Sequence, residues 1–247
     1  MAEPAYRTGR HKRKTLTFRQ PKSISKMSSI VKIISKEHLT HDVLRIVAEK
    51  PATLTFQPGQ AVDISVNKAG WEKELKPFTF TSLPEDGFIE FTIKTYPAHK
   101  GVTQQLFSLD RGDELIVGDV FGDIAYKGEG IFIAGGAGVT PFIAIFKQLE
   151  KKNAIGNNKL IFANKTTADI ILEDRFMKLL GNNFINVLSD EKLAGYEHGF
   201  LSAELIKKHM AGTKYFYLCG PEPMMQAAEK HLSSLGIAPG FIIKEAF

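Results

Sequence analysis

Residues 131–142 read IFIAGGAGVTPF, and residues 218–225 read LCGPEPMM. In both stretches an apolar run with the character of a strand meets glycine and then a segment with helical spacing. Pro141 suits the first turn of the first helix, where a backbone N–H is not needed. Glycine lets the backbone come close to a ligand. The two strand ends together predict a nucleotide lying across the carboxyl edge of a parallel sheet.

The glycine turn of the first stretch contains Gly135, Gly136 and Gly138. A helix that begins directly after it offers free amides and a partial positive charge to a pyrophosphate. The turn is not the G-x-G-x-x-G fingerprint, because Pro141 takes the place of the third glycine. A tight turn without a ligand is the alternative interpretation, and the second motif, Cys219-Gly220-Pro221, makes it the weaker one.

Two kinds of pattern meet near residues 126–130. Before them, short β-branched and aromatic runs are separated by turn residues, which indicates an antiparallel barrel or sandwich. One or two helical turns are expected at Val102–Leu109. The strands of this part are expected at 30–34, 43–49, 61–66, 78–82, 88–96 and 114–119.

After this point, near-continuous apolar strands alternate with helical segments, which is typical of βαβ units on a parallel sheet. The segment Lys127–Gly130 is expected to be a short flexible joint. The predicted organisation is a basic leader at 1–27, a β-barrel at 28–127 and an α/β unit at 128–247. Strands are expected at 131–135, 159–164, 184–189, 215–220 and 241–247, and helices at 141–151, 170–180, 202–210 and 222–235.

Composition excludes several classes of function. The chain has one cysteine among 247 residues, so it holds neither an internal disulfide nor a four-cysteine iron–sulfur site. This usage fits a reducing compartment, and we expect a cytoplasmic location. The sequence contains no run of about 18 apolar residues, so no transmembrane segment is predicted. The histidines lack the spacing of metal ligands, so no metal site is expected. The sequence also lacks the Gly-x-Ser-x-Gly motif of many hydrolases, so hydrolase activity is not indicated.

Positive charge is concentrated in the leader. Residues 1–26 contain eight basic residues and one acid, a net charge of +7, whereas the whole chain carries +5 and the remainder therefore −2. The leader is expected to be a disordered tail or an extension upstream of a start at Met27. The alternatives are an arm that attracts an acidic partner or anionic surface and, less favoured, a transit peptide. The near-neutral remainder argues against nucleic-acid binding.

The stretch Lys76–Ser82, KPFTFTS, places a cation and aromatic rings on one side of a strand and hydroxyls on the other. This set could serve a phosphate, a flat ring and ring heteroatoms, although an ordinary amphipathic strand would look the same. Lys94 and Tyr96 lie on the next β segment. Gly101-Val102-Thr103 could open a helix toward a second phosphate.

Taken in order, these motifs resemble the ferredoxin–NADP reductase superfamily, in particular its flavodoxin reductases and cytochrome b5 reductases. The family marks are Arg-x-Tyr-Ser/Thr-x-x-Ser, Gly-x-Ser/Thr, GGxGxTP, CGPxxM and a C-terminal Glu-x-aromatic. The sequence supplies KPFTFTS, GVT, GGAGVTP, CGPEPM and Glu245-Ala246-Phe247 over residues 28–247. The resemblance implies an antiparallel β-barrel that binds FAD, followed by an α/β parallel sheet that binds NADH or NADPH.

The resemblance also implies roles for single residues. Phe78 would stack on the isoalloxazine, Thr79 would hydrogen-bond near its N5, and Phe247 would cover the other face of the ring. Thr140, Gly138 and Cys219 would surround the nicotinamide, with Glu245 near the hydride path. The catalytic set is Thr79, Cys219, Glu245 and Phe247. The cofactor-binding set is Lys76, Pro77, Phe78, Thr79, Lys94, Tyr96, Gly101, Val102, Thr103, Gly135, Gly136, Gly138, Thr140, Pro141, Cys219, Gly220, Pro221, Met224 and Phe247.

Two positions depart from the family pattern. Lys76 replaces an arginine and loses its bidentate fork, and Phe78 replaces a tyrosine and loses its hydroxyl. A hydrogen bond to a charged group is worth about 1.5–3 kcal/mol. We therefore expect FAD to be held less tightly than is usual in the family.

The implied function is an NAD(P)H reductase that passes hydride to the flavin and electrons to a separate acceptor, such as flavodoxin, ferredoxin or a haem protein. Three alternatives are a reductase of free flavin, a non-catalytic nucleotide-binding subunit and an interaction module led by the basic arm. The choice between NADH and NADPH is expected to depend on residues 164–169. Lys165 could favour a 2′-phosphate, and Asp169 would oppose one. The segment slightly favours NADH, because it resembles the NADH-using branch of the family and lacks a pair of arginines.

Overall fold

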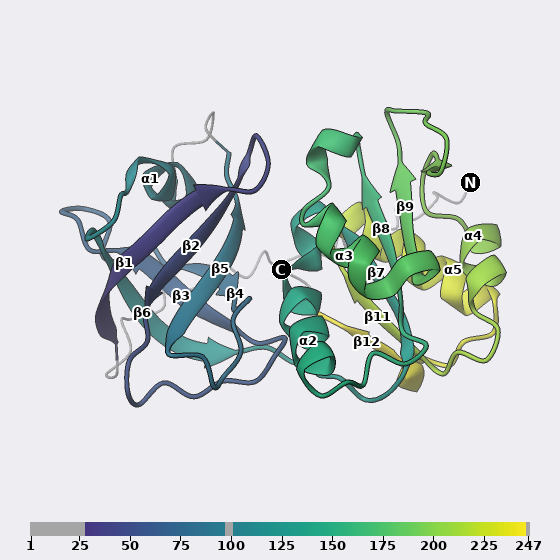
Figure 1. Ribbon diagram of the computed structural model, residues 1–247, viewed down its shortest axis with the longest axis horizontal. Coiled ribbons are helices and arrows are strands. Elements are labelled where there is room, and N and C mark those ends of the chain that lie inside the picture. Colours follow the sequence, from purple (N-terminus) through teal and green to yellow (C-terminus); the bar gives the residue numbers. More distant parts are fainter. Residues whose placement is uncertain (1–27, 97–100, 246–247) are drawn as a thin grey trace, which may run out of the picture.

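The protein is described by a computed structural model, which covers residues 28–96 and 101–245 (Figure 1). The basic leader and Phe247 lie outside the described residues. Two bodies lie side by side, one built of antiparallel strands and the other of parallel strands with helices on both faces. This arrangement confirms the predicted fold class. Among the described residues, no helix combines the length and the apolar character needed to cross a bilayer.

The first body is an antiparallel sheet with strand order β4-β3-β6-β1-β2-β5. Its two edge strands meet, because Phe80, one residue beyond β4, bridges to Phe91 on β5 and closes the sheet into a barrel. Phe80 is fully buried and stacks on Phe56 with ring centroids 3.9 Å apart. The elements are β1 (Ser29–His38), β2 (Val43–Glu49), β3 (Ala61–Val66), β4 (Lys76–Thr79), β5 (Phe88–Lys94), α1 (Val102–Ser108) and β6 (Glu114–Phe121).

The second body is a parallel sheet with strand order β10-β9-β8-β7-β11-β12. One face packs against α2 and α3, and the other packs against α4 and α5. The elements are β7 (Gly130–Gly135), the 3₁₀ turn η1 (Gly136–Val139), α2 (Thr140–Lys151), β8 (Lys159–Asn164), α3 (Glu173–Leu180), β9 (Phe184–Leu188), β10 (Glu197–His198), α4 (Ala203–His209), β11 (Tyr215–Cys219), α5 (Glu222–Ser234) and β12 (Ile242–Lys244).

The predicted elements differ from the structure mainly at their ends. The helix expected from Ile170 begins at Glu173, because Asp169 folds back and accepts hydrogen bonds from the backbone and hydroxyl of Thr166, which forms a separate 3₁₀ turn. Leu172, just before α3, then takes a left-handed backbone with φ of 55°. The final strand ends at Lys244, and the two-residue strand β10 was not expected.

The connection between the two bodies is held by one hydroxyl. Tyr217 Oη accepts hydrogen bonds from the backbone N–H groups of Lys127 and Gly128, at 2.8 and 3.1 Å, and donates to the carbonyl of Gly128 at 2.7 Å. The Tyr217 ring stacks on Phe132 at 4.2 Å. The prediction of a flexible joint at Lys127–Gly130 is therefore wrong, because a side chain from β11, about 90 residues away, fixes the backbone there.

Replacing Tyr217 by Phe removes the three hydrogen bonds and leaves the partly buried backbone groups of Lys127 and Gly128 without this partner. We expect the free energy of unfolding to fall by about 1–3 kcal/mol, measured by urea denaturation. Tyr215→Phe is the control, because among the described residues no partner is recorded for its hydroxyl. Equal stability of the Tyr217→Phe variant and the wild type would contradict the role of this hydroxyl.

Candidate functional site

The candidate site begins at the carboxyl edge of the parallel sheet, between β7 and β11. The chain forms β7 first, adds β8, β9 and β10 on one side, and then places β11 and β12 on the other. Cys219, the last residue of β11, pairs with Ala134, so the two motif strands end side by side. Ligands of open α/β sheets bind outside the carboxyl ends of the strands at such a reversal of strand order.

The glycines of the two motifs pack against each other. A Cβ added at Gly138 would overlap the carbonyl oxygen of Cys219. Added at Gly135 or Gly220, it would lie 2.5 Å from the side chain of Met224, from its sulfur or its terminal methyl respectively. Packing against backbone therefore requires glycine at Gly138, whereas Gly135 and Gly220 lie against the flexible end of the Met224 side chain. Gly136 differs, because its φ is 51° and no heavy atom lies within 4 Å of its added Cβ, which leaves an open surface.

Thr140 and Pro141 begin α2 directly after this turn, and both are buried. Pro141 occupies the first turn, as the sequence predicts. Pro221 precedes α5 and is exposed, whereas Met224 is half-buried between the two turns. The predicted nucleotide residues of the second body thus lie together along one edge of its sheet.

Cys219 and Glu245 lie close to each other near this edge. Burial raises the pKa of the Cys219 thiol to about 12, and the neighbouring charge of Glu245 acts in the same direction. Burial and the charge of Asp123 raise the pKa of Glu245. Its Oε2 is buried and has no hydrogen-bond partner within the described ranges. A thiol of this kind stays protonated at neutral pH and does not act as a nucleophile.

Glu245 also approaches the barrel. A Cβ added at Gly122, one residue beyond β6, would lie 3.2 Å from Oε1 of Glu245. The C-terminal end of the described chain therefore meets the barrel beside β6. Phe247, expected to cover the flavin, is outside the described residues.

The flavin strand of the resemblance is β4, at the edge of the barrel sheet. Lys76 and Pro77 are exposed, Phe78 is half-buried against the barrel core, and Thr79 is buried. A cation, a partly open aromatic ring and a hydroxyl thus follow one another along an accessible strand. Thr81 and Ser82, the end of the same motif, are fully buried and bind Glu90 of β5.

The remaining residues predicted to bind phosphate lie in two places, at the end of β5 and at the start of α1. Lys94 forms an ion pair with Asp42 at 2.8 Å, and Tyr96 is exposed. Gly101 precedes α1 and has no heavy atom within 4 Å of its added Cβ, and Thr103 is half-buried. Val102 packs in the barrel core, so its side chain is unavailable to a ligand and only its backbone could contribute.

Two polar groups near the edge were not predicted as site residues. Asn164, at the end of β8, has a buried side-chain amide without a partner in the part of the chain that the structure describes. Glu191, in the loop after β9, accepts hydrogen bonds from the backbone and hydroxyl of Thr167 at 2.7 and 3.0 Å. Asn164 lies in a segment that the sequence marks for nucleotide choice, whereas an isolated glutamate carries no signal in the sequence.

The residues present fit the two cofactors that the resemblance implies. Gly136 leaves open backbone at a helix start, and the orphaned amide of Asn164 offers donor and acceptor groups to a polar ligand. On the barrel, β4 offers Lys76 and Phe78 on an accessible edge. These features are the kind of groups that hold the phosphates and rings of dinucleotides.

Comparisons with known proteins agree with this arrangement. A sequence profile described as an FAD-binding domain matches residues 27–112, and one described as an oxidoreductase NAD-binding domain matches residues 132–230. NADH-cytochrome b5 reductase 1 of Aspergillus terreus is 30% identical over 88% of this chain and 81% of its own length. The reductase component of propane 2-monooxygenase from Rhodococcus jostii is 26% identical over 85% of this chain, which spans 61% of that longer protein.

Solved structures give the same assignment. The CS-b5R domains of human Ncb5or, in the NAD⁺ form, are 26% identical with a TM-score of 0.78, covering 89% of this chain and 70% of that one. A ferredoxin NADP⁺ reductase of Neisseria gonorrhoeae with bound FAD and NADP shares the fold, with a TM-score of 0.78 at 18% identity over 88% of this chain and 98% of that one. The chain belongs to the ferredoxin–NADP reductase superfamily and is a flavin-dependent NAD(P)H oxidoreductase.

Proposed function

We propose that the chain passes hydride from NADH to FAD on the barrel and delivers electrons to a separate haem protein, such as a cytochrome b5. The observation that carries the proposal is the position of the two site halves. Strand β5 of the barrel lies against η1, the glycine turn, and Glu245 lies against Gly122 of the barrel. FAD supplies an acceptor for a two-electron hydride and can then release electrons singly.

The domain assignment follows the two bodies. We assign residues 28–127 to the FAD-binding barrel and 128–247 to the NAD(P)H-binding unit, which the two profile matches at 27–112 and 132–230 support. The residues of the chain then act mainly by positioning. Phe78 supplies an apolar ring and Thr79 a hydroxyl donor for the flavin. The protonated thiol of Cys219 supplies an uncharged contact surface for the nicotinamide.

The choice of a haem acceptor rests on the relatives and on the absence of cluster ligands. A relative that matches most of the chain is named as a reductase of cytochrome b5. One cysteine in 247 residues leaves no four-cysteine cluster in this chain, so the electrons must leave it. A different acceptor protein, such as a ferredoxin, a flavodoxin or a monooxygenase component, is the alternative, since one relative is named as the reductase component of a monooxygenase.

The preference for NADH rests on two carboxylates beyond β8 and β9. The carboxylate of Asp169 accepts a hydrogen bond from the backbone N–H of Thr166. Burial raises the pKa of Asp169, but the hydrogen bonds from Thr166 and the nearby cations lower this pKa overall, so Asp169 is charged at neutral pH. Glu191 binds Thr167 from the next loop. Both would repel a 2′-phosphate, and Lys165 is the opposing cation of the segment.

The function is tested by anaerobic titration of the FAD-loaded protein. We expect one equivalent of NADH to bleach the flavin absorbance and cytochrome b5 to restore it. Thr79→Val should slow bleaching by up to about 10-fold, because a hydrogen bond to a neutral ring nitrogen is worth about 0.5–1.5 kcal/mol. Protein that binds FAD but stays oxidised with NADH would contradict the proposal. Loss of FAD on purification, with turnover of added flavin, would identify a free-flavin reductase.

The nucleotide preference is tested with Glu191→Gln, which keeps an acceptor for Thr167 and removes one negative charge. We expect kcat/KM for NADPH to rise about 10-fold, since a charge-assisted contact is worth 1.5 kcal/mol or more, while the value for NADH changes little. Glu204→Gln makes the same charge change on the exposed side of α4 and should have no such effect. An unchanged NADPH value in Glu191→Gln would remove Glu191 from the site.

The burial and protonation of the Cys219 thiol are tested with a chromogenic disulfide reagent at pH 8. Its pKa, raised to about 12 by burial, keeps the thiol neutral, so the native protein should not react. After unfolding in guanidinium chloride, one thiol per chain should react, because the sequence has one cysteine. Stoichiometric reaction of the native protein within seconds would contradict a buried neutral thiol.

A further inference from the structure

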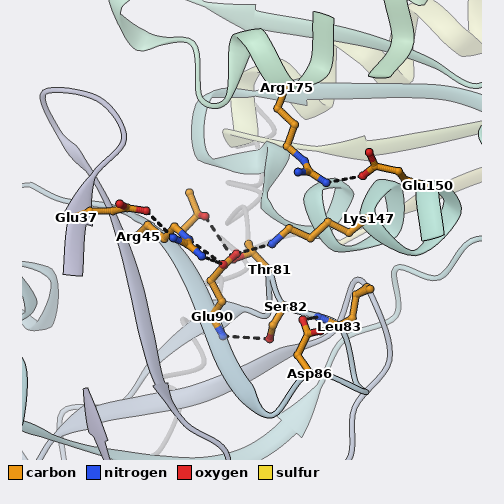
Figure 2. Close-up of polar contacts among 11 residues, drawn as sticks. Glu37, Arg45, Thr81, Ser82, Leu83, Asp86, Glu90, Lys147, Glu150 and Arg175 are labelled. Carbon is orange, nitrogen blue, oxygen red and sulfur yellow. Dashed lines mark hydrogen bonds and ion pairs between the residues drawn. The ribbon is translucent and has the colours of Figure 1, made fainter. Parts of the chain in front are cut away.

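A buried carboxylate joins the two bodies across their interface. Glu90 of β5 has a side chain only 4% exposed, and Lys147 of α2 reaches it from the nucleotide unit at 2.7 Å (Figure 2). Arg45 of β2 binds the other oxygen of the same carboxylate, at 2.7 and 2.8 Å. Burial raises the pKa of Glu90, but the charge and hydrogen bond of Lys147, followed by the hydrogen bonds from Arg45 and Thr81, lower it overall.

The same carboxylate is bonded to the strand that carries the flavin residues. The Thr81 hydroxyl donates to Glu90 at 2.8 Å, and the backbone N–H of Glu90 donates to the Ser82 hydroxyl at 3.0 Å. Both residues follow Thr79 within three positions along the chain. Movement of Glu90 would therefore move the end of the flavin strand.

On the other side of the interface, Lys147 belongs to the helix that begins at the nucleotide site. It lies seven residues after Thr140 on α2, about 10 Å along the helix axis. The Glu90–Lys147 pair thus connects the strand after Thr79 to the helix that starts at Thr140. No other described ion pair between the two bodies is buried to a similar degree.

A second pair one turn further along α2 provides the comparison. Lys151 binds Glu85 of the barrel at the same distance of 2.7 Å, but these side chains are 57% and 44% exposed. Water and salt screen an exposed ion pair of this kind, so it contributes little to the stability of the interface. Without Lys147, Glu90 would keep Arg45 and Thr81 on the barrel side but lose its partner on α2. The buried oxygen that faces α2 would then lack its charged donor, so the local structure must shift or admit water.

We infer that the Glu90–Lys147 pair is a positioning contact that sets the angle between barrel and nucleotide unit for the hydride step. The inference rests on the proposed function. Lys147 acts through α2 rather than on either cofactor, so its loss should leave the affinity for each cofactor unchanged and alter the approach of one ring to the other. Displacement of reacting groups by about 1 Å can slow a reaction about 100-fold.

The test compares Lys147→Met, Lys147→Arg and the control Lys151→Met, each loaded with FAD. Anaerobic stopped-flow bleaching at increasing NADH gives the limiting rate and the dissociation constant separately. We expect Lys147→Met to lower the limiting rate about 10- to 100-fold, with dissociation constants for NADH and FAD within about two-fold of the wild type. Lys147→Arg should recover most of the rate, and Lys151→Met should match the wild type.

A limiting rate in Lys147→Met equal to that of the wild type would overturn the positioning role, even if the melting temperature fell. An equal loss in Lys151→Met would overturn it as well, because burial would then not distinguish the two pairs. Wild-type protein that NADH does not bleach contradicts the proposed function itself, together with the inference. If Lys147→Met does not fold, Lys147→Ala gives the same comparison, because alanine also removes the ammonium group that binds Glu90 and favours a helix.

Discussion

The packing of one glycine turn into another determines where everything else in the site lies. Gly138 rests on the carbonyl of Cys219, and Gly135 and Gly220 enclose Met224. Because even a methyl group at Gly138 would overlap the carbonyl of Cys219, the turn after β7 and the end of β11 lie in direct backbone contact. Thr140 at the start of α2 and Cys219 at the end of β11 are consequently neighbours along one sheet edge, which makes a shared nucleotide site possible.

Three kinds of contact hold the two bodies together: hydrogen bonds, a buried ion pair and close packing. Tyr217 fixes the connection at one end of the sheet, and the Glu90–Lys147 pair fixes α2 against the barrel. Glu245 meets the barrel at Gly122 near the opposite, carboxyl end. In a reaction that needs no nucleophile from the protein, the accuracy of such contacts determines how closely two rings can meet.

The sequence contains enough information to predict both sheets, because strand runs with period two and near-continuous apolar strands differ clearly in pattern. Through GGAGVTP and CGPEPM it also predicts two strand ends at one sheet edge, and β7 and β11 do end side by side, with Cys219 paired to Ala134. It could not predict that Gly138 packs on the carbonyl of Cys219, that Val102 belongs to the core, or that Lys94 is paired with Asp42. These facts depend on contacts between distant segments, as do Glu90 and Lys147, which are 57 residues apart.

The account depends on one face of the reduced nicotinamide being presented to the flavin by a fixed interface. The most direct measurement uses NADH deuterated at C4 on one face or on the other, with analysis of the NAD⁺ formed by mass spectrometry. The account predicts complete loss of deuterium from one stereoisomer and complete retention in the other. Equal loss from both would show that the nicotinamide is not held in one orientation against the flavin.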